Sequence, residues 1–322
     1  MAKILVTGGA GFIGSHIADA LVEKNEVVVL DNLSTGNIEN IRHNFGKKRF
    51  RFVKGDVTNE CLVGRLAKDC DIIIHQAAVV GVKHYVANPL SVLLVNAHGT
   101  ESVLEAGRKN DCEVLFASTS EVYGKCKDIP LSEDDDRLLG STKIDRWCYS
   151  TSKAFDEHLC FAYVKEYGVD VKIVRYFNTY GPRARSNDYS GVIPIFIRRV
   201  LHGKPPQVHG DGKQTRCFTY ISDVVEGTLL VCRRGRKGEV YNIGNNEETS
   251  IIELANAIVR ISGRKLKPEF IDYEDFYGES YEDIRRRVPD ISKMKKLGWK
   301  PKVGLLEGLK KTFDWYKEEM RR

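Results

Sequence analysis

KILVTGGAGFIGSHIADAL, residues 3–21, joins a short apolar run to a helical pattern through a glycine-rich turn that includes Gly8, Gly11 and Gly14. The apolar run predicts a buried strand, and the spacing of the apolar residues after it predicts a helix over 12–24. Glycines at such a junction let the backbone turn tightly and approach a pyrophosphate, whose charge then lies at the helix N-terminus. The stretch therefore predicts a dinucleotide site, the alternative being a glycine turn that binds no nucleotide.

Acidic and small residues follow at the ends of the next expected strands. EVVVLD ends in Asp31, about 20 residues beyond the glycines, where a carboxylate can accept hydrogen bonds from both hydroxyls of an adenine ribose. Such a carboxylate repels a 2′-phosphate, which favours NAD over NADP. Asp56 and Val57 end the third strand, and HQAA ends the fourth, where the small Ala77 would let a cofactor lie close to the backbone.

Short β-branched runs alternate with helical patterns up to about residue 175, and this alternation is typical of an α/β fold with a doubly wound parallel (Rossmann) sheet. After Gly181 the order becomes irregular. We therefore expect an NAD-binding domain over 1–180 and a smaller C-terminal substrate-binding region over 181–322. Helices are predicted near 90–109, 149–167, 191–202, 222–234, 250–262 and 304–319.

Composition excludes several classes of protein. The net charge of +6 is modest for 322 residues and its basic clusters are scattered, which argues against nucleic acid as a partner. Eight cysteines form no C-x-x-C pair, so no metal site is predicted. No apolar stretch approaches the ~20 residues of a membrane span, and the first apolar run leads into the glycine turn rather than a signal peptide. We expect a cytoplasmic protein with no membrane contact.

Tyr149 and Lys153 form a candidate catalytic pair in RWCYSTSK. Four residues apart on a helix, the phenol and the ammonium share one face. A nearby cation stabilises phenolate, so Lys153 is expected to lower the pKa of Tyr149 toward working pH and make it a base for a sugar hydroxyl. A solvated helix pair is the alternative for Y-x-x-x-K alone.

Taken together, the chain resembles the extended short-chain dehydrogenases that modify nucleotide sugars. The resemblance covers essentially the whole sequence and is carried by motifs in the right order: TGGAGFIGSH, DNLSTG, GDV, NAHGT (96–100), STSEVYG (118–124), YSTSK, YFNTYGPR (176–183), GDGKQTRCF (210–218), YNIGN (241–245) and LGWKP (297–301).

That resemblance implies roles for individual residues. Thr119 would hydrogen-bond the substrate O4 beside Tyr149. A nucleotide-diphosphate sugar, expected to be a UDP-sugar, would be held by Asn178, Val192, Arg216 and Tyr281. The residues implied to touch NAD are Phe12, Ile13, Asp31, Asn32, Asp56, Val57, Asn96, Tyr149, Lys153 and Phe177.

The same family forms homodimers through helices that correspond to 90–109 and 149–167. Apolar positions at helical spacing occur on both, although they could equally belong to the core of one chain: Val92, Val95, Val103, Leu104, Phe155, Leu159 and Tyr163.

Glu121 and Arg287 bear on which reaction follows oxidation at C4. Relatives that do chemistry at C5 carry a glutamate at the position of Glu121, and Arg287 in RRRVPDIS aligns with an arginine that UDP-glucuronate decarboxylases place beside the C6 carboxylate. An arginine can bind that carboxylate bidentately, and the glutamate can manage protonation of the enolate left behind. The resemblance is therefore strongest to UDP-glucuronate decarboxylase, also called UDP-xylose synthase.

Other activities stay open at this stage. A 4-epimerase acting on UDP-glucose or UDP-glucuronate shares the first step, and so does a 4,6-dehydratase, although Ser120 stands where the dTDP-glucose type has an aspartic acid. A protein that binds NAD without catalysis is the alternative of a different class. Glu121 could serve as a helix cap, Arg287 as an external salt bridge and Arg216 as an ordinary surface residue.

Overall fold

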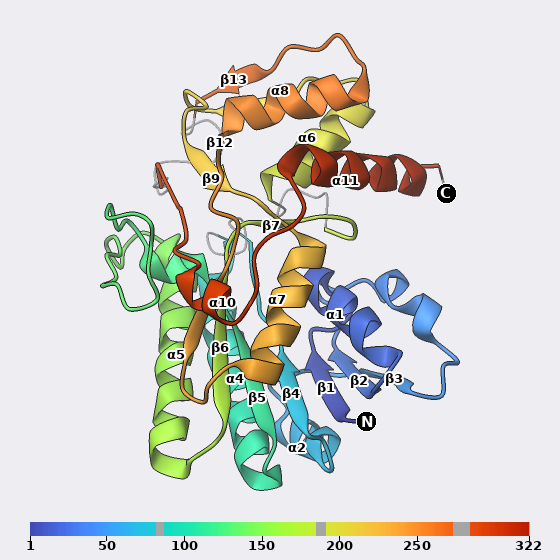
Figure 1. Cartoon of the computed structure of the whole chain (residues 1–322), viewed down its shortest axis with the longest axis vertical. Coiled ribbons are helices and arrows are strands. Elements are labelled where there is room, and N and C mark those ends of the chain that lie inside the picture. The colour runs from blue at the N-terminus through green and yellow to red at the C-terminus, as the bar shows by residue number, and fades with distance from the viewer. Residues whose placement is uncertain (82–86, 185–190, 273–283, 322) are drawn as a thin grey trace.

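The computed structural model describes residues 1–81, 87–184, 191–272 and 284–321. A seven-stranded parallel sheet with the order β11-β6-β5-β4-β1-β2-β3 forms its centre (Figure 1). This is the doubly wound order, with strand order reversing beside β1, and it confirms the predicted fold class. The strands are β1 (Lys3–Thr7), β2 (Glu26–Asp31), β3 (Phe50–Lys54), β4 (Ile72–His75), β5 (Glu113–Thr119), β6 (Val171–Tyr176) and β11 (Val240–Ile243).

Helices cover both faces of the sheet, because alternate strand residues point to opposite sides. Ile4 and Val6 pack toward α1 and α7, whereas Leu5 packs in a second core with α2, α4 and α5. The central strands are thus buried on both faces, as their unbroken β-branched runs predict. These helices are α1 (Phe12–Val22), α2 (Glu60–Ala67), α4 (Pro89–Asn110), α5 (Trp147–Tyr167) and α7 (Ile221–Arg234), with 3-10 turns η1 (Ile38–Asn40), η2 (Arg42–Asn44) and η3 (Ser120–Tyr123).

A smaller region lies beyond the carboxyl ends of the strands (Figure 1). Helix α8 (Ile251–Ser262) of this region is capped by Ser250, whose side chain accepts a hydrogen bond from the Glu253 amide while the Glu253 side chain accepts one from the Ser250 amide. The region contains α6 (Val192–Leu201), α8 (Ile251–Ser262), α11 (Leu305–Glu319), β8 (Gln207–His209), β9 (Thr215–Cys217), β12 (Glu248–Ser250) and β13 (Glu269–Ile271). The parallel pair β7 (Thr179–Tyr180) and β10 (Thr219–Tyr220) and the short α10 (Ser292–Lys296) connect it to the sheet.

The chain crosses between the two regions more than once. Beyond the predicted boundary at residue 180 it returns to the sheet, since α7 packs on α1 and β11 pairs in parallel with β6. The division into 1–180 and 181–322 stays a prediction, and the sheet itself extends past it.

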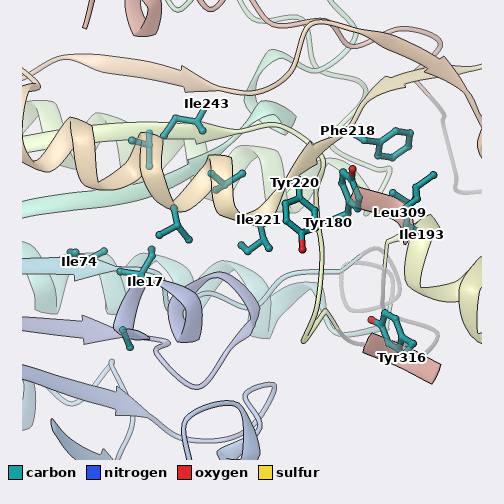
Figure 2. Packing of buried hydrophobic residues seen from close by; sticks show 14 of the residues in the cluster. Ile17, Ile74, Tyr180, Ile193, Phe218, Tyr220, Ile221, Ile243, Leu309 and Tyr316 are labelled. Atoms are coloured by element: carbon teal, nitrogen blue, oxygen red, sulfur yellow. The ribbon is translucent and has the colours of Figure 1, made fainter. Parts of the chain in front are cut away.

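One hydrophobic core spans both regions (Figure 2). Ile17 and Ile74 lie at its sheet end, and Ile193 and Leu309 at its other end. Tyr180 bridges the two: it is 2% exposed and makes an edge contact with Tyr220, and it lies so close to Gly308 of α11 that any Cβ there would collide with its hydroxyl. A shared core of this kind fixes the region beyond the sheet relative to the strand ends.

The helices expected at a dimer interface lie side by side. Of the apolar positions predicted there, Val92, Val103 and Leu104 are fully buried inside the chain, and Phe155 is half exposed. Within the described ranges no helix is both long and apolar enough to cross a membrane.

Candidate active site

The glycine turn after β1 packs closely against neighbouring backbone, so side chains would not fit at Gly8 and Gly14. Gly8 has a φ of +68°, and a Cβ there would lie 2.6 Å from the Ala77 backbone nitrogen. A Cβ at Gly14 would collide with the Gly8 carbonyl, and Gly11 is the residue from which α1 begins. The turn leaves the first amides of α1, including those of Phe12 and Ile13, at the carboxyl end of β1. Backbone amides in this position suit a pyrophosphate.

Carboxylates and amides line the same edge of the sheet further along. Asp31 is buried at the end of β2 and accepts hydrogen bonds from the amides of Ala10 (3.0 Å) and Leu33 (2.8 Å). The Asn32 amide donates to Asp56 at 2.8 Å, so two residues distant in sequence meet here. Val57 is buried beside them. These groups fit the adenosine half of NAD.

The residues expected to contact the rest of NAD lie on the other side of the switch point, on the β4, β5 and β6 side of β1. Asn96 on α4 accepts from the Val79 amide at 2.8 Å and donates to Ser152 at 3.2 Å, which ties α4 to α5. Ala77 follows β4, and Phe177 is fully buried just after β6. All the cofactor residues predicted from sequence thus lie at the carboxyl ends of the strands or in the helices that follow, and the donors present fit NAD.

Tyr149 and Lys153 lie one turn apart in α5, and both are buried. Thr119 ends β5, hydrogen-bonds the Tyr149 phenol and accepts from the Glu121 amide at 3.2 Å. The predicted Thr119 and Tyr149 pair is therefore in contact. Lys153 Nζ instead donates to the Ala117 carbonyl oxygen at 2.9 Å and lies 3.8 Å from the Asp156 carboxylate.

The pKa values of Tyr149 and Lys153 in this structure follow from burial and from neighbouring charges. Burial raises the pKa of Tyr149 above its usual range, and the Glu121 carboxylate adds to the rise, although the Thr119 hydrogen bond opposes it. Burial also lowers the pKa of Lys153, which Asp156 opposes. The Lys153 ammonium contacts Ala117 and Asp156, and the lowering of the Tyr149 pKa by Lys153 stays a prediction.

Glu121 and Arg287 meet although 166 residues separate them in sequence. Arg287 Nη1 lies 2.7 Å from Glu121 Oε1 and 3.5 Å from the Ser120 hydroxyl. The arginine is 4% exposed, and its Nη2 is buried with no hydrogen-bond partner among the described residues. An external salt bridge, the alternative for Arg287, is thus ruled out, whereas Arg285 and Arg286 are exposed and pair with Asp211 and Glu248.

A second arginine, which sequence reasoning missed, contacts the same carboxylate. Arg146 Nη2 lies 3.3 Å from Glu121 Oε2. Burial favours the neutral form of Glu121, but the charges of Arg287, Arg146 and Arg216 outweigh it and lower its pKa to about 2. Glu121 is therefore a carboxylate at neutral pH. The signal in the sequence that could have identified Arg146 is its position three residues before the catalytic candidate Tyr149.

Of the residues expected to hold the nucleotide, three are described: Asn178, Val192 and Arg216. Asn178 follows β6, and its side-chain oxygen is buried with no hydrogen-bond partner in the described part of the chain. Arg216 lies in β9, bonds the Thr215 carbonyl at 2.8 Å, and is near enough to Glu121 to lower its pKa. Val192 is the first residue of α6. Tyr281 lies outside the described residues.

The segment that carries Arg287 is anchored to the first region by backbone hydrogen bonds. The amide of Leu131 donates to Val288 at 2.7 Å, and the amide of Asp290 donates to Leu131 at 2.8 Å. Asn242 of β11 adds side-chain bonds to Leu131 and Asp290 at 3.0 and 3.1 Å. Arg287 is thereby fixed against the sheet that positions Glu121.

Across the described ranges, no His, Cys, Asp or Glu cluster is suited to a metal.

Comparisons with known proteins agree with this geometry. The model of the NAD-dependent epimerase/dehydratase family matches residues 4–244. A UDP-N-acetyl-alpha-D-glucosaminuronate decarboxylase of Bacillus cytotoxicus is 41% identical over 98% of both chains, and UDP-glucuronic acid decarboxylase 1 of Xenopus tropicalis is 38% identical over 99% of this chain and 73% of its own. A UDP-N-acetylglucosamine 4-epimerase of Methanobrevibacter ruminantium, solved with UDP-N-acetylmuramic acid, superposes with a TM-score of 0.91 at 32% identity over 99% of both chains. The predicted resemblance is confirmed: this chain belongs to the NAD-dependent epimerase/dehydratase family and is an NAD-dependent enzyme.

Proposed function

We propose that the protein is a UDP-hexuronate decarboxylase, with UDP-glucuronate as the leading substrate. The observation that carries the proposal is the charge of the buried cluster beside Tyr149. Two guanidinium groups, Arg287 and Arg146, face one carboxylate, Glu121, and Arg287 Nη2 has no partner among the described residues. Buried charge needs a partner, so the cluster suits a substrate that brings one more carboxylate.

The contacts support an order of events on the sugar. Bound NAD would supply the hydride acceptor for oxidation at C4 and the donor for the later reduction. Thr119 and Tyr149 face the C4 hydroxyl, from which Tyr149 takes the proton. Once C4 is a ketone, the C6 carboxylate is β to it, the C5–C6 bond breaks, and its electron pair becomes an enolate over C5, C4 and O4 as carbon dioxide leaves. A proton added at C5 restores the ketone.

Glu121 takes part as an anion. Since its pKa is lowered to about 2, it holds no proton to give at neutral pH. It can accept a hydrogen bond from a water molecule and orient that water toward C5. Ser120, 3.5 Å from Arg287, can add a hydrogen bond to the substrate carboxylate.

Epimerisation at C4 is the second candidate, because the same cluster would also bind a UDP-hexuronate that keeps its carboxylate. The solved epimerase neighbour favours this alternative. A 4,6-dehydratase is less favoured, since that reaction needs an acid for the departing C6 hydroxyl and the cluster offers Ser120 and an ionised Glu121. A non-catalytic NAD-binding protein is disfavoured by the contact between Thr119 and Tyr149.

The test is to incubate the enzyme and NAD separately with UDP-glucuronate, UDP-N-acetylglucosaminuronate, UDP-glucose and GDP-mannose. Carbon dioxide is trapped and the sugar is followed by NMR. Carbon dioxide and a UDP-pentose from a hexuronate support the proposal. Interconversion of UDP-glucuronate and UDP-galacturonate without carbon dioxide would make the protein an epimerase, and a 4-keto-6-deoxy sugar would make it a dehydratase.

We also infer that the enzyme is a homodimer formed through α4 and α5. Leu94 of α4 is 46% exposed, and Phe155 and Phe161 of the adjoining α5 are 50% and 37% exposed. Large apolar side chains gathered on two neighbouring helices suit an interface. Light scattering should give twice the chain mass, and Phe155→Glu should shift it toward the monomer. A wild-type monomer would contradict the inference. The cytoplasmic location stays a prediction.

A further inference from the structure

Arg146 occupies a position that is electrostatically costly unless an anion is beside it. It immediately precedes α5, a helix of 21 residues, and is 4% exposed. The N-terminus of a helix carries a partial positive charge, so a buried cation there is repelled by the helix as well as desolvated. The Arg146 guanidinium makes a cation–π contact with Trp147, with its Cζ 5.3 Å from the centre of the ring. A negative group that lies beside Arg146 offsets part of this cost.

That group is Glu121, and its two oxygens are divided between two arginines. Oε2 lies 3.3 Å from Arg146 and Oε1 lies 2.7 Å from Arg287. The two arginines come from distant parts of the chain: Arg146 immediately precedes α5, and Arg287 lies between β13 and α10. The titratable and charged groups that act on Glu121 are these two arginines, Arg216 and the Tyr149 phenol.

The division matters once a substrate is bound, a step that rests on the proposed function. A substrate carboxylate that pairs with Arg287 shares this guanidinium with Glu121 and brings a second negative charge close to it. Two carboxylates at one site favour uptake of a proton by one of them. Arg146, which contacts the other oxygen of Glu121, is then the cation that keeps Glu121 ionised and in place.

We propose that Arg146 is a positioning residue that holds the Glu121 carboxylate ionised and aimed at the sugar while Arg287 is engaged by the substrate carboxylate. Arg146 acts through Glu121 and does not contact the reacting carbons. The proposal separates two functions in the cluster: Arg287 recognises the substrate, and Arg146 maintains the group that acts after binding.

The experiment compares Arg146→Gln, Arg146→Lys and Arg285→Gln with the wild-type enzyme loaded with NAD. Arg285 is a matched control because its side chain is 78% exposed and pairs with Asp211 outside the cluster. Steady-state carbon dioxide release from UDP-glucuronate is measured from acid to neutral pH, and melting temperature and NAD content are recorded for each variant.

Arg146→Gln should lower kcat by about 10- to 100-fold and change KM by less than about threefold, since misplacement of a working group costs turnover rather than binding. Its kcat should fall at a higher pH on the acid side than that of the wild type, because removal of a cation raises the pKa of Glu121. Arg146→Lys, which restores the charge, should recover most of both changes, and Arg285→Gln should match the wild type.

Three results would overturn the proposal. Arg146→Gln could keep the wild-type kcat and pH profile. KM could rise together with the loss of kcat, which would make Arg146 a recognition residue. Both Arg146 variants could lose melting temperature and NAD content equally, which would make the role structural. A wild-type enzyme that releases no carbon dioxide from either hexuronate would instead overturn the proposed function, and this is seen before any variant is assayed.

Discussion

Replacement of Arg287 by glutamine removes the charge expected to recognise the substrate while keeping a polar side chain of similar length. The wild-type side chain is buried, 2.7 Å from Glu121, with Nη2 unpaired among the described residues. Loss of one partner of a buried, hydrogen-bonded charge pair costs about 2–5 kcal/mol in binding. At 1.4 kcal/mol per factor of ten, kcat/KM for UDP-glucuronate should fall by about 30-fold to several thousand-fold.

The folded enzyme should tolerate this change better than most losses of a buried ion pair. Removal of one partner costs about 3–5 kcal/mol when the other charge is left bare. Glu121 would not be bare in Arg287→Gln, because Arg146 still contacts Oε2 at 3.3 Å. The melting temperature should therefore change much less than the affinity for substrate.

The assay pairs turnover of UDP-glucuronate with calorimetric binding of UDP-glucose, which has a neutral C6 group. Arg287→Gln should weaken UDP-glucuronate and leave the Kd for UDP-glucose within a few-fold, and Arg285→Gln should change neither. Equal losses for the two sugars, or equal effects of Arg285→Gln and Arg287→Gln, would refute recognition of a carboxylate by Arg287.

Three further predictions concern the catalytic pair, the cofactor and a buried acid. Tyr149→Phe should lower kcat by about 10²–10⁴-fold with nucleotide-sugar binding nearly unchanged, and Lys153→Ala should lower both turnover and NAD affinity; full activity of either variant would place the pair elsewhere. NADP should bind at least about 10-fold more weakly than NAD by fluorescence titration, because Asp31 repels a 2′-phosphate; equal affinities would contradict this. Burial raises the pKa of Asp156 to about 6 from 3.8, so its contribution to stability is present at low pH and is lost as pH rises through about 6. Asp156→Asn should therefore gain melting temperature relative to the wild type between about pH 4 and pH 7, and a constant difference would argue against the shift.

Local pattern predicted the elements well because it reports burial along one helix or strand. The helix expected over 90–109 is found at Pro89–Asn110, and the one expected over 304–319 is found at Leu305–Glu319. What the pattern does not contain is pairing between distant segments. The return of Val240–Ile243 to the first sheet depends on its register with β6, which no local period encodes.

The site shows the same division between local and distant information. Spacing alone placed Tyr149 and Lys153 on one face, and the structure agrees. Their surroundings, however, include groups that are distant in sequence: the Ala117 carbonyl accepts a hydrogen bond from the Lys153 ammonium, and the Glu121 carboxylate disfavours ionisation of the Tyr149 phenol. The sequence does not single out Arg146 for a similar reason, since its contact with Glu121 joins residues that lie on different elements.

The movement of charge during decarboxylation explains why such a cluster suits this reaction better than dehydration. Departure of the C6 hydroxyl as water needs a proton on its oxygen, and neither Ser120 nor an ionised Glu121 can readily give one. Departure of carbon dioxide needs none, because the negative charge that Arg287 binds in the ground state passes to O4, beside Thr119 and Tyr149, and the leaving group is neutral. Arg287 thus binds the carboxylate in the bound substrate and still during oxidation at C4, and loss of such uniform binding raises KM. The residues that must act after the charge has moved are those around O4 and C5, which is why loss of Arg146 should appear in kcat and loss of Arg287 in KM.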